Sequence, residues 1–220
     1  MSRSDKGVVC GLCWSRLSLL PSPQCDRCGH PQLSDVCQWC DLLPPFVRAI
    51  RSVCWMPMEP ASSIVHALKY DGWSAVAGDL ADRMGRLSWP RDVLEERQAL
   101  IPVPLASARK RQRGYNQSAL IARALGERWQ LPVWENVVHR TRETGTQTRL
   151  TPEERRANVA GSFRVAGDTR ELVDAHVIIV DDVVTTAATL NSCAKVLYDA
   201  GARIISYVTF GRAHASGDRL

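Results

Sequence analysis

Short apolar runs without a polar face predict the strands of this chain. Residues 99–103 and 177–180 are such runs, and the second is β-branched throughout, as is typical of strands buried on both faces. A further strand is predicted over 204–210. Because a helical segment separates the last two strands, a right-handed parallel crossover between them is expected.

Apolar residues at helical spacing predict the helices between these strands. They fall at 76–87, at 121–129 and at 190–197, where Gly201 ends the last helix. Thr151-Pro152-Glu153-Glu154 combines a capping box with a first-turn proline and predicts another helix start. From about residue 53 onward the pattern is therefore that of an α/β protein.

The composition limits the size and class of the protein but does not identify its function. With 220 residues, 45% of them hydrophobic, the chain suits one domain plus a small appendage. The net charge of +5 indicates only that anionic partners are tolerated. Because the apolar runs are too short to cross a bilayer and the start is charged, we expect a cytoplasmic protein with reduced cysteines and no membrane span.

Six of the eight cysteines form three Cys-x-x-Cys pairs near the start of the chain: Cys10/Cys13, Cys25/Cys28 and Cys37/Cys40. Two such tight turns complete a tetrahedral zinc site, and the last two pairs are the preferred set. Cys10 and Cys13 remain possible ligands in a different pairing, and redox-active or buried thiols are the alternatives to zinc. Structural zinc supplies about 10–16 kcal/mol in small peptides, enough to fold a segment without its own core. Residues 1–45 are thus predicted to form a zinc-ribbon module, and 46–215 the main domain.

The segment 180–189 carries the most informative chemistry. Asp181 and Asp182 end a buried parallel strand, the position at which open α/β sheets bind ligands. Hydroxyl residues then lead into a helix, whose unpaired N–H groups and positive dipole suit a phosphate. Carboxylates beside a phosphate would repel it unless they bind another group. Ribose hydroxyls or a divalent cation could be that group. The alternative is that the two acids only cap the helix.

A basic run, 109–113, follows the strand that ends at 102–104. Such a run is commonly a solvated face. Here it is predicted to form a loop over the same sheet edge as the acids, where Arg111 and Arg113 could neutralise a pyrophosphate leaving group.

With this segment the chain resembles the ComF family, which includes ComFC- and GntX-like proteins. The matching pieces are the cysteine pairs and the segments 67–72, 102–104, 113–117, 140–142, 146–147, 155–158 and 180–189. The resemblance implies a type I phosphoribosyltransferase-like parallel sheet flanked by helices, with an N-terminal zinc ribbon. It also implies a role in natural transformation or in the use of DNA as a nutrient, alongside the DNA-uptake machinery.

The resemblance further assigns candidate ligand contacts. Asp181 and Asp182 would hold the ribose hydroxyls, and the loop from Thr185 to Thr189 would wrap the 5-phosphate. The phosphate-loop residues are Thr185, Thr186, Ala187, Ala188 and Thr189, and Gln147 and Arg156 are contacts from a segment covering the site. The family has glycine where this chain has Ala187, so a Cβ there is expected to tilt the loop or weaken binding.

Two main classes of function follow, and a purely structural adaptor is a weaker third. The first is an enzyme that binds phosphoribosyl pyrophosphate with Mg²⁺ and transfers ribose phosphate to an unknown acceptor. The second is a binding module that holds a sugar phosphate or single-stranded DNA without turnover, with Tyr115 and Trp14 stacking on bases.

Overall fold

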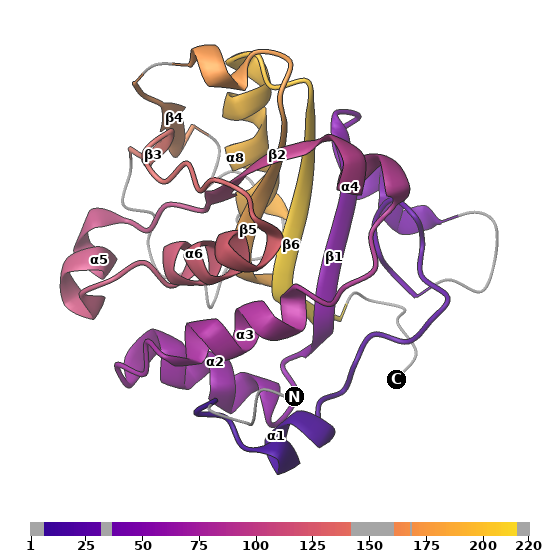
Figure 1. The fold of residues 1–220 in the computed structure, drawn as a ribbon, viewed down its shortest axis with the longest axis vertical. Helices are drawn as coiled ribbons and strands as arrows, with labels where there is room; N and C mark the ends of the chain where they lie inside the picture. The colour runs from indigo at the N-terminus through magenta and orange to yellow at the C-terminus, as the bar shows by residue number, and fades with distance from the viewer. Residues whose placement is uncertain (1–6, 32–36, 142–160, 168, 215–220) are drawn as a thin grey trace.

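The computed structural model describes residues 7–31, 37–141, 161–167 and 169–214, and these build a four-stranded parallel sheet in the order β1-β6-β5-β2 (Figure 1). The strands are β1 (Val47–Met56), β2 (Arg97–Pro102), β5 (His176–Val184) and β6 (Ile204–Ala213). Since β5 lies between β2 and β6, the carboxyl ends of β2 and β5 lie side by side in the sheet. Ligands of open α/β sheets bind outside the carboxyl ends of the strands.

Helices cover both faces of this sheet. The larger ones are α2 (Ala61–Tyr70), α3 (Val76–Met84), α6 (Gln117–Trp129) and α8 (Ala188–Asp199). The smaller elements are α1 (Gly11–Ser15), η1 (Gln38–Leu42), α4 (Arg91–Glu96), α5 (Ser107–Arg113), η3 (Arg170–Leu172) and an antiparallel pair, β3 (Val138–Arg140) with β4 (Phe163–Val165). Figure 1 shows α2, α3 and α6 gathered together, away from α8.

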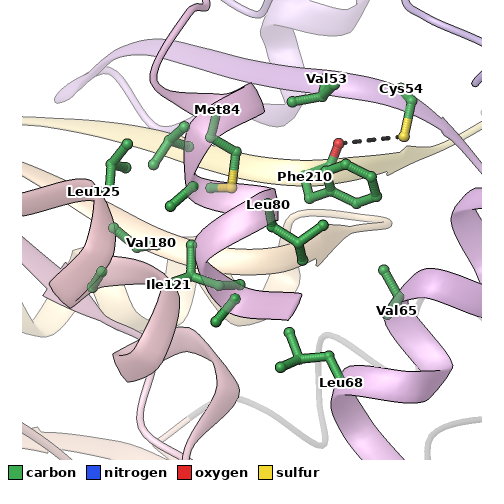
Figure 2. Packing of buried hydrophobic residues seen from close by; sticks show 14 of the residues in the cluster. Val53, Cys54, Val65, Leu68, Leu80, Met84, Ile121, Leu125, Val180 and Phe210 are labelled. Carbon is green, nitrogen blue, oxygen red and sulfur yellow. Dashed lines mark hydrogen bonds between the residues drawn. The ribbon is translucent and has the colours of Figure 1, made fainter. Parts of the chain in front are cut away.

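The side chains of β5 alternate between two cores, as a strand buried on both faces requires. Ile178 and Val180 pack with residues of α2, α3 and α6, whereas Val177 and Ile179 pack with α8. In Figure 2 the first core is seen from close by, with α3 and α6 contributing leucine, isoleucine and methionine side chains around Val180. This packing fixes β5, and with it the acids at its end.

The predicted strands and helices that lie within the described residues are confirmed. Gly201, at φ +111°, follows the end of α8 as expected, and the helix that begins at Val76 ends at Met84. The helix start predicted at 151 lies outside the described residues. One expectation was wrong: the basic run 109–113 belongs to helix α5, not to a loop.

The first strand, β1, was missed because arginines interrupt its apolar run. Arg51 is nevertheless buried, and its guanidinium donates to the carbonyl oxygens of Ser88, Ile50 and Asp26 at 2.8–2.9 Å. A charge so bonded is tolerated inside a sheet. No sequence period signals such a strand.

The cysteine-rich segment packs against β1 and β6. The Ile50 N–H donates to Arg27 O at 2.9 Å, and Arg212 Nη2 donates to Cys28 O at 2.6 Å. Cys25 and Cys28 are buried in the same core as Ile50. The division of the chain at residue 45 stays a prediction. Among the described residues, no helix is long and apolar enough to cross a membrane.

Candidate functional site

A cavity of about 430 Å³ opens where β2 and β5 end. Both acids of the strand end line it, together with Thr185 and Thr189 of the following turn. The remaining polar residues of its lining come from α2, α5, α6 and β3: Lys69, Tyr70, Arg109, Arg113, Gln117, Ser118 and Arg140. The structure therefore brings the predicted acids and hydroxyls to one cavity, and adds residues that the sequence patterns did not single out.

Asp182 is buried and forms an ion pair with Lys69, the penultimate residue of α2. Gln117 Nε2 also donates to its Oδ1 at 3.2 Å. Burial opposes ionisation, but the charge and hydrogen bond of Lys69 outweigh it and hold the pKa of Asp182 below its ordinary value. Asp182 is thus a fixed negative charge in the cavity wall.

Asp181 has a different environment. Its Oδ1 accepts from Ser118 Oγ at 2.8 Å and from the Asp182 N–H at 2.9 Å. Burial, together with the negative charge of Asp182, raises the pKa of Asp181 to about 7. Two adjacent carboxyl groups therefore differ in proton affinity, which allows Asp181 to exchange a proton near neutral pH.

The segment 113–117 positions the partners of both acids. Tyr115 Oη donates to Leu68 O at 2.5 Å, which ties the end of α2 and its Lys69 to the start of α6. Asn116 caps α6 by accepting from the Ser118 N–H at 3.1 Å, and its Nδ2 donates to Val103 O at 3.0 Å. These bonds hold Gln117 and Ser118 against the acids.

The hydroxyl turn leads into α8 through Ala187, which lies in the left-handed region at φ +56°. That conformation explains why glycine suits this position. The Ala187 side chain does not line the main cavity; with Thr186 it lines a smaller one of about 50 Å³ beside Cys28 and Trp39. The Cβ thus packs toward the cysteine segment rather than toward the space between the acids and Thr185. Ala188 is the first residue of α8 and lines neither cavity.

Three guanidinium groups line the other side of the main cavity, those of Arg109, Arg113 and Arg140. Burial and the neighbouring positive charge of Arg109 lower the pKa of Arg140. Like charges held together at a cavity wall favour an anionic ligand between them. Arg111, predicted for this role, is exposed on α5 and does not line the cavity, whereas Arg113 does. Gln147 and Arg156 lie outside the described residues.

The two aromatic residues considered for base stacking are packing residues here. Tyr115 is partly buried against the first core with its hydroxyl bonded to Leu68 O. Trp14 packs edge-on against Phe210 at 6.2 Å between ring centroids, and the Arg83 guanidinium lies 4.7 Å from its ring centre.

A second candidate site is formed by four thiols. The Sγ atoms of Cys25, Cys28, Cys37 and Cys40 all lie within 4.8 Å of one another, with Cys25–Cys40 at 3.5 Å and Cys28–Cys37 at 3.4 Å. Four thiolates at about 2.3 Å from a central ion require comparable sulfur spacings. The cluster can therefore hold a metal ion. Among the described residues no other His, Cys, Asp or Glu group has such spacing, and Cys10 and Cys13 are not part of it.

The loops that carry these thiols are held by Arg27. Its guanidinium donates to the carbonyl oxygens of Val47, Cys40, Leu43 and Pro44 at 2.8–3.3 Å. His30 packs between Trp39 and Trp55, with ring centroids 5.0 and 5.9 Å away, and so is a packing residue.

Comparisons with known proteins identify the family of the chain. The sequence profile of the family described as "Phosphoribosyl transferase domain" matches residues 76–219. "Competence protein F" of Haemophilus influenzae is 30% identical, over 94% of this chain and 92% of that protein. The chain belongs to the ComF family of phosphoribosyltransferase-domain proteins.

Other ComF relatives align over most of their length. "DNA utilization protein YhgH" of Salmonella typhi is 34% identical, over 90% of this chain and 87% of that protein. "Competence protein ComFC" of Bacillus subtilis is 26% identical, over 88% of this chain and 79% of that protein. Because the profile match includes 181–189 and the alignments extend well before it, the ComF assignment applies to the sheet domain and to most of the preceding chain.

Within this ComF chain, sequence reasoning gave no role in the site to six polar residues of the cavity wall: Lys69, Tyr70, Arg109, Gln117, Ser118 and Arg140. A signal existed for some of them, since Lys69 and Arg140 lie in segments shared with the family. Ser118 directly follows another shared segment, and Arg109 starts the basic run. What no pattern showed is that α2 meets α6 through the Tyr115 hydroxyl.

Proposed function

We propose that this ComF-family protein binds phosphoribosyl pyrophosphate with Mg²⁺ in the cavity at the ends of β2 and β5, and acts in the cytoplasm in DNA uptake or DNA utilisation. One observation carries the proposal: the buried acids 181–182 share a cavity with the hydroxyl turn and with three guanidinium groups. A phosphorylated sugar with a pyrophosphate group requires hydroxyl acceptors, a phosphate cradle and cationic neutralisation in the same place.

Each part of the ligand has a proposed counterpart. The carboxylates of Asp181 and Asp182 accept from ribose hydroxyls, while Thr185 and Thr189 bind the 5-phosphate near the start of α8. Arg109, Arg113 and Arg140 face the pyrophosphate. In a transfer reaction the bond between the ribose anomeric carbon and the pyrophosphate oxygen breaks, and pyrophosphate leaves with the bonding electrons. An electron pair of the acceptor, whose identity is unknown, forms the new bond to the anomeric carbon. The guanidinium groups stabilise the charge that develops on it.

The residues present fit Mg²⁺ in a limited way. This ion prefers oxygen ligands and commonly takes one or two carboxylates plus substrate phosphates. Asp182 is already paired with Lys69, so Asp181 is the carboxylate that this chain offers. Bound Mg²⁺ would neutralise phosphate charge. For the four-thiol cluster we propose Zn²⁺ in a structural role, because an all-thiolate tetrahedral set is typical of structural zinc.

The proposed biological role rests on the relatives. Proteins named for competence and for DNA utilisation align with most of this chain, including the segment before the sheet. An excess of positive charge in the whole chain is compatible with an anionic partner. The phosphoribosyl ligand and the DNA role are separate parts of the proposal and need separate tests.

The ligand is tested by calorimetric titration of phosphoribosyl pyrophosphate with Mg²⁺ into the wild type, Asp181→Asn and Asp182→Asn. The matched control is Asp199→Asn, an exposed acid on α8 that pairs with Lys195 at 2.8 Å. We expect binding in the wild type and the control, and loss of at least about tenfold in affinity in the two variants, as for a hydrogen bond to a charged group worth about 1.5–3 kcal/mol. Equal affinity in all four proteins contradicts the proposal.

A second candidate function is a module that binds single-stranded DNA or a sugar phosphate without turnover. It is favoured by the existing partners of both acids, Lys69 for Asp182 and Ser118 for Asp181. Affinity for an oligonucleotide at two salt concentrations, with pyrophosphate release measured in parallel, separates the two. A steep fall in affinity with salt and no pyrophosphate favours the module.

A further inference from the structure

A second large cavity adjoins the first on the side of α2 and α5. Its volume is about 560 Å³, and Lys69, Tyr70, Arg109 and Arg113 line both cavities. The rest of its lining is Asp71, Gly72 and Gln112. Because four residues are shared, a molecule in the second cavity would lie directly beside a ligand in the first.

An aromatic ring forms part of this second cavity. Tyr70 is the last residue of α2 and is 68% exposed. The Arg113 guanidinium lies 5.2 Å from its ring centre, and the His66 ring lies 4.8 Å away. The Arg113 guanidinium and the His66 imidazole hold the Tyr70 ring in place while much of it remains accessible. Such a ring offers a stacking surface to a flat ligand.

The charges of the second cavity favour an anion. Lys69 is paired with Asp182, which leaves the guanidinium groups of Arg109 and Arg113 as the further cationic groups of the lining. The single acid of the lining, Asp71, lies 3.3 Å from His66 Nδ1. Both arginines come from α5, a helix without buried residues. Their charges therefore face solvent and the cavities rather than a core.

We propose that the second cavity binds a nucleotide, with its base on Tyr70 and its phosphate between Arg109 and Arg113. A flat heterocycle joined to a phosphate matches an exposed ring flanked by guanidinium groups. The inference deepens the proposed function, on which it rests, by placing a second ligand of stated chemistry beside the phosphoribosyl ligand. The nucleotide can be free or part of a DNA strand, since both present the same base and phosphate.

The experiment measures binding of thymidine 5′-monophosphate, of thymidine and of a short oligothymidine to the full chain. Wild type is compared with Tyr70→Leu and Arg109→Ala. Each has a matched control: Tyr198→Leu, an exposed tyrosine on α8, and Lys110→Ala, the neighbour of Arg109 that lines neither cavity. Circular dichroism confirms that each variant is folded.

The expected result is that Tyr70→Leu weakens the monophosphate by at least about fivefold, the lower limit for losing a stacked base. Arg109→Ala weakens the monophosphate but leaves thymidine, which has no phosphate, nearly unchanged. Both control variants bind like the wild type. Gln112→Glu places a negative charge in the second cavity alone and should also weaken the monophosphate.

The same measurements distinguish a free nucleotide from a DNA strand as the ligand. Tighter binding of the oligothymidine, with the same dependence on Tyr70, assigns the cavity to a strand, and equal binding assigns it to a free nucleotide. Indifference of all three probes to Tyr70→Leu and Gln112→Glu overturns the inference. Titration of phosphoribosyl pyrophosphate into the same proteins is recorded separately, so that failure of the proposed function is seen independently of the nucleotide result.

Discussion

Replacement of Lys69 by methionine tests the buried ion pair between Lys69 and Asp182. The Lys69 side chain is 24% exposed and that of Asp182 is 5% exposed, so removal of the cation leaves a buried carboxylate without its counter-charge. Loss of one partner of a buried ion pair costs about 3–5 kcal/mol. Because Lys69 keeps some contact with solvent, we expect the lower figure, about 3 kcal/mol. For a chain of this size that corresponds to a fall in Tm of about 6–12 °C.

The assay is urea unfolding of wild type, Lys69→Met, Asp182→Asn and the double variant. The double variant should lie within about 1 kcal/mol of the wild type, because no uncompensated charge remains in it. The matched control is Lys195→Met, which breaks the exposed pair with Asp199. An exposed helical pair contributes only about 0.3–0.5 kcal/mol, so this control should barely change stability.

The stability loss in Lys69→Met should also depend on pH in a defined direction. In the wild type the pKa of Asp182 is lower in the folded state than in the unfolded chain. Its ionisation therefore stabilises the fold above the unfolded pKa, and this stabilisation is lost as the pH falls. In Lys69→Met the largest remaining influence is burial, which raises that pKa against the hydrogen bond from Gln117. The folded state then takes up a proton more readily than the unfolded chain, so the variant loses stability as the pH rises. The deficit of the variant should therefore be smaller at pH 5 than at pH 8. A deficit under about 1 kcal/mol that does not change with pH would refute the buried pair.

Three further predictions concern the acids, the turn and the thiols. The pKa of Asp181 is raised to about 7, so below pH 7 the affinity for phosphoribosyl pyrophosphate should increase about tenfold for each unit by which the pH is raised, and above pH 7 it should level off. Calorimetry at each pH measures this. Asp181→Asn keeps the titration of the ligand itself but lacks that of Asp181, so its profile should be flatter. Ala187→Gly should change the free energy of unfolding by less than about 1 kcal/mol. Glycine removes a backbone strain of about 1–2 kcal/mol at this left-handed position, but it costs about 0.4–1 kcal/mol in unfolded-chain entropy and about 0.8 kcal/mol for the lost burial of the methyl group. Its phosphate affinity should stay within about twofold, as measured by titration. Cys28→Ser should lower the metal content and the Tm of the purified protein, measured by elemental analysis and calorimetry, whereas Cys10→Ser should alter neither.

Strands with continuous apolar runs were predictable because burial on both faces leaves a direct trace in the sequence. The run 177–180 became the centre of β5, and the two acids that follow it reached the cavity as expected. Helix α6 was likewise visible from its spacing. In contrast, β1 was hidden by Arg51, whose burial depends on carbonyl acceptors that include Ser88 and Asp26 of distant segments.

The partners of the acids were not predictable for a related reason. A lysine at the end of a helix is commonly a solvated residue, and nothing local distinguishes Lys69 from one. Its role depends on the hydrogen bond from Tyr115 to Leu68, which links residues 47 positions apart. Arg111 was named from the sequence and Arg109 was not, because a loop was predicted where α5 forms; the helix places Arg109 and Arg113 in the cavity lining.

The position of the cysteine segment suggests why it accompanies this sheet. Thr186 and Ala187 of the hydroxyl turn line the small cavity together with Cys28 and Trp39, and Arg212 of β6 donates to Cys28 O in the same place. The turn therefore has the cysteine segment on one side and the ligand cavity on the other. A left-handed alanine at such a turn costs free energy, and the Ala187 methyl recovers part of that cost by packing against this core. A metal ion that orders the four thiols would then also support the outer side of the turn, although the two lie about 150 residues apart in the sequence.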